Sequence, residues 1–197
     1  ICHEHYEYYS LTTIKYILDK AELLIADVIF NDMNGGSFGV IACKNPSLIS
    51  KKSKATINWV IEREKNLKFN SITPYLEFAS KVESFREDLV SLIKKLKKSG
   101  ATICGIGAST KGNVLLQYCN FSSQEITCIG DVNKDKFGCF TPGTYIPIVS
   151  ENEVLSLKPD YLLILPWHFK EHFIDRFKEF RLSGGKIIFP LPTIQIL

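Results

Sequence analysis

The segment from Gly105 to Asn113, called the glycine loop below, carries residue types suited to holding phosphate. It reads GIGASTKGN and lies between an apolar run typical of a strand and a run typical of a helix. At such a turn, small residues let the backbone approach an anion, and the helix N-terminus offers N–H groups and partial positive charge. The residues that we expect to contact a phosphate-bearing ligand are Gly105, Gly107, Lys111, Gly112 and Asn113.

The glycine loop departs from both common phosphate-binding patterns. Thr110 stands where G-x-G-x-x-G has its third glycine, and the G-K-[ST] ending of a P-loop is missing. The segment therefore indicates either a phosphate cradle or a tight turn that binds no ligand.

Asp131 follows the next predicted strand, about 20 residues beyond the glycine loop, where an acid meets a ribose hydroxyl in dinucleotide-binding domains. Capping a turn with Asn133 is the alternative role. Ligands of open parallel sheets bind beyond the carboxyl ends of the strands. We therefore expect Asp131 to converge on the glycine loop together with the segments 141–147 and 166–169.

These two segments add polar and aromatic side chains to the expected site. Thr141 and Tyr145 come from the first segment, and Trp167 and His168 from the second. Trp167 and Phe169 offer surfaces on which a base or sugar would stack, and simple packing at a strand end is the alternative. The same alternatives apply to Tyr145. His168 would donate a hydrogen bond to a phosphate or titrate near neutral pH.

The chain opens on a segment, Cys2 to Tyr9, that concentrates histidines, acids and tyrosines. Neighbouring residues on an extended chain point to opposite faces, and the segment has no H-x-x-x-H or C-x-x-C pair, so we predict no metal site here. General acid or base chemistry by His5, oriented or charge-balanced by Glu4, suits the residue types better.

The elements that must position these residues follow from apolar spacing, caps and turns. Residues 11–22 and 74–98 are predicted as helices, 48–67 as a weak helix, and 24–30 and 38–43 as the strands of a hairpin. Further along, strands over 102–106, 125–130, 161–165 and 186–189 alternate with helices over 111–119, 151–156 and 168–182.

That alternation predicts an α/β fold, with a Rossmann-like parallel sheet and helices on both faces. A small helix plus β-hairpin segment and a long connecting helix precede the sheet. We expect a first domain over residues 1–70 and a nucleotide-binding domain over 71–197 that includes its leading long helix.

Composition limits the classes of function. A chain of 197 residues that is 45% hydrophobic can form a sizeable core. A net charge of +3 is too small to indicate a nucleic-acid partner, and no apolar run is long enough to span a membrane. Six cysteines without a C-x-x-C pair indicate reduced core thiols of a cytoplasmic protein. Because the sequence begins without Met, we expect a fragment of a longer protein.

A series of short motifs runs along nearly the whole chain. In order they are Glu4-His5-x-x-Tyr8-Tyr9-Ser10-Leu11, Gly35-Gly36-Ser37, Gly105-x-Gly107-Ala108-x-x-Lys111-Gly112-Asn113, Asp131-x-Asn133, Thr141-Pro-Gly-Thr-x-Ile-Pro147 and Pro159-Asp-Tyr161. This order resembles the C-terminal portion of sugar-nucleotide C-methyltransferases, which use S-adenosylmethionine.

The resemblance implies that a Rossmann-like domain holds a nucleotide-linked 4-keto deoxysugar. It implies that His5 removes a proton from the sugar carbon beside the ketone, with Glu4 as a neighbouring acid, and that the enediolate attacks the methyl group of S-adenosylmethionine. In that family a zinc-binding domain and the S-adenosylmethionine domain precede this region. We therefore expect this chain to bind a nucleotide diphosphate sugar without methylating it alone.

Three positions depart from the family pattern. Cys2 stands where Tyr is common, Phe38-Gly39 where Leu-Arg is usual, and His168 where Asn is common. The main alternative is therefore a non-catalytic nucleotide-sugar-binding module with the same fold. A nicotinamide-dependent oxidoreductase, a third hypothesis, rests on the glycine loop alone. The sequence leaves the oligomeric state open.

Overall fold

A computed structural model describes residues 7–32 and 36–197, whose contacts divide the chain into two compact units. One unit extends to Ser80, and the other begins at Lys81. Glu4 and His5 lie outside the described residues, so the roles predicted for them stay predictions.

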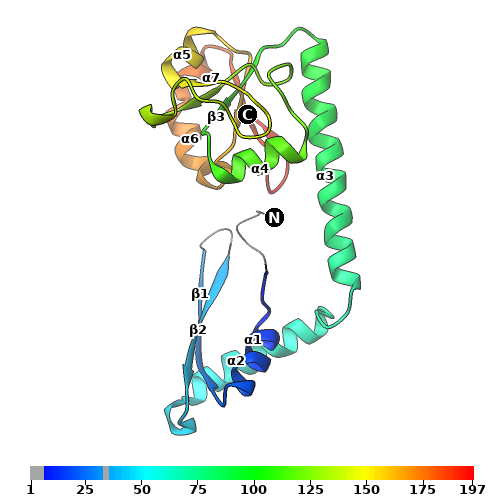
Figure 1. Cartoon of the computed structure of the whole chain (residues 1–197), viewed down its shortest axis with the longest axis vertical. Helices are drawn as coiled ribbons and strands as arrows, with labels where there is room; N and C mark the ends of the chain where they lie inside the picture. Colours follow the sequence, from blue (N-terminus) through cyan, green and yellow to red (C-terminus); the bar gives the residue numbers. More distant parts are fainter. Residues whose placement is uncertain (1–6, 33–35) are drawn as a thin grey trace. The chain divides into compact units, whose positions relative to one another are not determined.

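The first unit confirms the predicted helix and hairpin (Figure 1). Helix α1 spans Leu11–Lys20, and strands β1 (Leu24–Asn31) and β2 (Ser37–Cys43) pair in antiparallel register. A short turn of 3-10 helix, η2 (Pro46–Leu48), leads to α2 (Lys51–Asn66), which begins after the N-cap Ser50. The core of this unit is small and consists of Leu11, Ile25, Val28, Ile57 and Val60, with partly buried neighbours packed against it.

Glu64 fixes the beginning of α1 from a distant part of the chain. Its carboxylate is buried and accepts hydrogen bonds from the backbone N–H of Leu11 (2.6 Å), the backbone N–H of Thr12 (2.8 Å) and the Thr12 hydroxyl (2.5 Å). A helix N-terminus leaves backbone N–H groups without intrahelical partners and favours negative charge. Glu64 therefore ties α1 to α2 at the end of α1 that follows the predicted catalytic segment.

The second unit is a largely parallel sheet of six strands in the order β5-β4-β3-β6-β7-β8, with the last pair antiparallel. Its strands are β3 (Ile103–Ile106), β4 (Ile129–Asp131), β5 (Ile148–Ser150), β6 (Tyr161–Ile164), β7 (Lys186–Phe189) and β8 (Gln195–Ile196). The long helix α3 (Thr73–Lys98) precedes the sheet, and α4 (Thr110–Tyr118) follows β3. The remaining helices are α5 (Glu151–Ser156), α6 (Lys170–Arg176) and α7 (Lys178–Leu182), with 3-10 turns η3 (Lys134–Lys136) and η4 (Trp167–Phe169).

Both faces of this sheet are covered, as predicted. Successive strand residues point to opposite faces, so Ile103 packs with Leu89 and Ile93 of α3, whereas Cys104 packs with Phe173 and other residues of the α5 to α7 side. Figure 1 shows α5, α6 and α7 gathered on the side of β3 away from α3. No helix among the described residues is long and apolar enough to cross a membrane.

Four details differ from the sequence prediction. The predicted strand 125–130 is only Ile129–Asp131, because Ser122 and Glu125 form a side-chain-capped turn before it. β5 and β8 were not predicted. The predicted helix 168–182 is divided into η4, α6 and α7, with a break at Phe177, whose side chain is buried. The weak helix begins at Lys51 rather than at residue 48.

Candidate functional site

The strand order reverses at β3. From β3 the chain continues to β4 and β5 on one side, and then crosses to β6 and β7 on the other. Loops that leave neighbouring strands in opposite directions open a crevice beyond their carboxyl ends, and ligands of open α/β sheets bind there. The loops at this point are the glycine loop after β3 and the segment from Leu165 to Phe169 after β6.

The glycines of the glycine loop allow close packing at this crevice. Gly107 has φ +84°, and a Cβ added there would lie 2.4 Å from Cγ of Pro166. A Cβ on Gly112 would lie 2.7 Å from Cβ of Leu165, and one on Gly105 would lie 2.3 Å from Cδ1 of Ile129. Packing alone therefore requires glycine at Gly107 and Gly112, with or without an anion, whereas at Gly105 the overlapping atom is the end of the Ile129 side chain.

Much of the backbone of the glycine loop is already hydrogen-bonded within the protein. The N–H of Gly107 donates to the Gly130 carbonyl (2.7 Å), and the N–H of Ala108 donates to the Asp131 carboxylate (2.8 Å). Ser109 caps α4 by accepting from the N–H of Gly112 (3.1 Å). An anion at this loop would therefore depend on side-chain charge and on the helix dipole more than on a ring of open N–H groups.

Lys111 and His168 belong to the two segments that border the crevice, after β3 and after β6. Burial lowers the pKa of His168, and the positive charge of Lys111 lowers it further. The His168 ring lies 4.2 Å from the Phe169 ring, centroid to centroid, and 58% of Phe169 is exposed. Trp167, by contrast, packs against the cores on both sides of the sheet. The two segments thus offer the ammonium of Lys111, the neutral imidazole of His168 and the exposed aromatic surface of Phe169.

Asp131 connects three segments at the end of β4. One carboxylate oxygen accepts from the N–H of Asn133 (2.8 Å), and the other accepts from Ala108 and from the ammonium of Lys136 (3.1 Å). Burial alone would raise the pKa of Asp131, but the donors from Asn133, Lys136 and Ala108 hold it below its ordinary value. The turn-capping role with Asn133 is therefore present, and a ribose contact stays a prediction.

Asn113 offers an acceptor near the first turn of α4. Its side-chain oxygen is buried and has no hydrogen-bond partner among the described residues. Such an atom is costly to leave without a donor. A ligand hydroxyl or N–H group would supply that donor.

Thr141 and Tyr145 belong to the turn between Phe140 and Pro147, two residues that form an isolated antiparallel bridge. Thr141 is buried and accepts from the N–H of Ile146 (2.9 Å), which closes the hairpin that precedes β5. The neighbouring Pro142 carbonyl accepts from Gln117 near the C-terminal end of α4 (2.7 Å). The glycine loop is at the other end of α4, so this contact does not bring the segment 141–147 to it, and the expected convergence stays a prediction.

Polar residues that the sequence analysis missed surround the end of β5. Arg176 of α6 pairs with Glu151 at the start of α5, at 2.6 Å between nitrogen and oxygen. Burial raises the pKa of Glu151, and the charge of Asp131 adds to the rise, although Arg176 and His172 oppose it. Neither residue belongs to a recognisable motif, and only the fold brings them together. No group of three or more His, Cys, Asp or Glu side chains suited to a metal ion occurs in the described part of the chain.

The fold defines a Rossmann-like α/β domain, with Lys111 and His168 in the two segments that follow the strands at its topological switch point. The family model described as the C-methyltransferase C-terminal domain matches residues 32–192. The chain belongs to this family, as its motif order indicated.

A curated relative is the C-methyltransferase NovU of Streptomyces niveus. It is 32% identical over 197 residues, which cover 100% of this chain and 46% of the relative. The chain therefore spans about half the length of the curated relative it matches.

Proposed function

We propose that this chain binds a nucleotide diphosphate sugar beyond the carboxyl ends of β3 and β6. As part of a C-methyltransferase that uses S-adenosylmethionine, it would present a 4-keto deoxysugar for methylation. The observation that carries this proposal is the position of Lys111 and His168 in the two segments at the switch point of the sheet, where the charge of Lys111 lowers the pKa of His168. Membership of the C-methyltransferase family supports the reaction class.

The described residues supply complementary parts of such a site. Lys111 and the N-terminus of α4 would hold the diphosphate, since both favour negative charge. The side-chain oxygen of Asn113 would accept from a ligand hydroxyl or N–H, and Phe169 would offer a face for stacking. Asp131 would hold the glycine loop in place through Ala108.

The described residues do not fit S-adenosylmethionine itself. Its sulfonium is a cation, and the carboxyl edge of the sheet carries the ammonium groups of Lys111 and Lys136. The methyl donor would therefore bind in another part of the enzyme. His5 remains the proposed base that takes the proton from the sugar carbon beside the ketone, with Glu4 beside it. Zinc has no part in the proposal.

Calorimetric titration with thymidine, uridine, guanosine and cytidine diphosphates tests the binding proposal directly. Saturable binding of one of them is expected. Lys111→Ala should weaken it by about tenfold or more, because a charge-assisted hydrogen bond contributes about 1.5–3 kcal/mol. Lys98→Ala is the matched control, since it removes the same charge from the end of α3, which is separated from this edge by the length of β3. Equal affinities of the two variants would contradict the proposed site.

The non-catalytic alternative differs from the enzyme in one measurable respect. In the full-length protein, His5→Ala should abolish methyl transfer to a 4-keto sugar nucleotide while nucleotide binding persists. If the full-length protein binds the nucleotide sugar and transfers no methyl group to any 4-keto sugar nucleotide, the domain is a binding module.

A further inference from the structure

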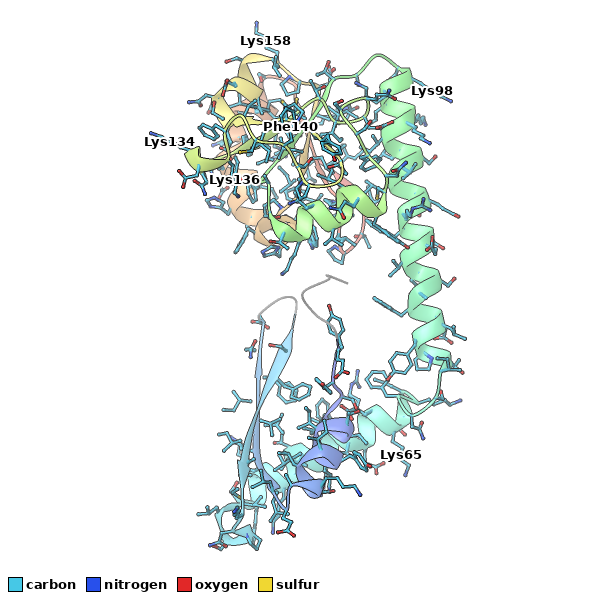
Figure 2. All side chains as sticks on the ribbon, in the orientation of Figure 1. Lys65, Lys98, Lys134, Lys136, Phe140 and Lys158 are labelled. Carbon is cyan, nitrogen blue, oxygen red and sulfur yellow. The ribbon has the colours of Figure 1, made fainter. Side chains whose placement is uncertain are left out.

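Lys136 lies against the glycine loop from the β4 side, although it is far from that loop in sequence. Two side-chain caps turn the chain back after β4: Asp131 accepts from the N–H of Asn133 (2.8 Å), and Asn133 accepts from the N–H of Asp135 (3.0 Å). This path brings Lys136, at the end of η3, to the carbonyl of Ala108 at 3.0 Å. Figure 2 shows Lys136 well away from Lys158 and Lys98 within this unit.

The ammonium of Lys136 has one N–H donor that its hydrogen bonds to Ala108 and Asp131 do not use. An ammonium group carries three N–H donors and no acceptor. Two of the donors are accounted for by Ala108 and by Asp131 at 3.1 Å. The side chain is 38% exposed, and no acceptor for the third donor occurs among the described residues.

Two lysine ammonium groups belong to or contact the glycine loop. Asp131 has a lowered pKa and stays ionised at neutral pH, but its oxygens already accept from Ala108, Asn133 and Lys136. Lys111 is part of the loop itself, and Lys136 contacts the loop through Ala108 and through Asp131. Since much of the loop backbone is internally bonded, the attraction for a second phosphoryl group would come mainly from side-chain cations.

We infer that Lys136 is a second phosphate-binding residue, so that Lys111 and Lys136 hold the two phosphoryl groups of a diphosphate at the glycine loop. This inference rests on the proposed function and narrows it. The site should prefer diphosphates to monophosphates, because only a diphosphate engages both cations.

The test compares thymidine and uridine 5′-diphosphates with their 5′-monophosphates on four proteins: wild type, Lys136→Met, Lys136→Arg and Lys134→Met. Lys134→Met is the matched control because Lys134 lies in the same 3-10 turn and is exposed. Lys136→Met should weaken diphosphate binding by about tenfold or more and monophosphate binding by no more than about threefold. Lys136→Arg should restore most of the loss, and Lys134→Met should bind like wild type.

Salt separates a direct phosphate contact from a loop support. Added salt screens ionic contacts at an exposed rim, so diphosphate affinity should fall less steeply with ionic strength in Lys136→Met than in wild type. A purely structural role would weaken monophosphates equally and leave the salt dependence unchanged, and either result would overturn the inference. If diphosphates bind through Lys111 but ignore Lys136, the inference fails and the proposed function stands. If wild type binds no nucleoside diphosphate, both fail.

Discussion

The protonation state of His168 changes the charge at the crevice with pH. Burial and the charge of Lys111 both place the pKa of His168 below its ordinary value. The imidazole is therefore neutral at pH 7 and gains a proton only as the pH falls through that lowered pKa. Protonation adds positive charge, so anion binding should strengthen at lower pH.

Replacing Lys111 by Met should raise the pKa of His168 toward 6.5, because one of the two causes of the shift is removed. The imidazole signals of His168, followed by NMR over pH, measure this change. His172 in the same chain is an internal reference, and Lys98→Met is the control variant. An unchanged titration curve for His168 in Lys111→Met would show that the two side chains do not interact.

The junction between β3 and α4 depends on the absence of a side chain at Gly107. Gly107→Ala and Gly138→Ala both place a Cβ on left-handed backbone, at φ +84° and +78° respectively, but a Cβ at Gly138 meets nothing within 4 Å. Gly138→Ala should cost about 1–3 kcal/mol of unfolding free energy through backbone strain. Gly107→Ala should cost about 1–3 kcal/mol more, because its Cβ overlaps Pro166.

Urea unfolding of both variants measures the difference. Pro166→Ala in the Gly107→Ala background should recover part of the extra loss, because it removes the overlapping ring atoms. Equal stabilities of Gly107→Ala and Gly138→Ala would show that the junction relaxes around the added methyl group.

Elements with a strong local signal were predictable from the sequence, and short ones were not. The hairpin, α3, α4 and the strands β3, β6 and β7 follow from apolar runs bounded by caps and glycines. β5 has three residues and β8 has two, too few to show a period, and pairing with β4 and β7 defines them.

Only part of the candidate site could be predicted, because a local sequence pattern does not show which residues the fold brings together. A glycine that admits a neighbouring side chain and a glycine that admits a phosphate look the same in a sequence. Lys136 belongs to no motif that the sequence analysis could use. Its position at the glycine loop is determined by two successive side-chain caps, which only the structure shows.

At the scale of the whole molecule, β3 lies in the middle of its sheet between strands from later parts of the chain. β4 begins at Ile129 and β6 at Tyr161, so β3 acquires its two neighbours through connections of very different length. The crevice exists only when both neighbours are in place. Ligand binding should therefore be coupled to the integrity of the entire sheet rather than to the glycine loop alone.

The rate at which a reagent modifies the buried cysteines measures that coupling between ligand binding and the integrity of the sheet. Cys104 of β3 and Cys128, which immediately precedes β4, have their sulfur atoms 3.7 Å apart. Cys119 is buried with a pKa raised to about 11 by its burial, whereas Cys139 is exposed. A thiol reagent should modify Cys139 at once and the buried thiols only when the sheet opens. Ligand at 100 times its dissociation constant should slow modification of Cys104 about 100-fold and leave the rate at Cys139 unchanged, as peptide mass spectrometry can follow. The modification rate of the buried Cys104 thiol would thus report the affinity of an unlabelled compound, even when the structure of that compound is unknown.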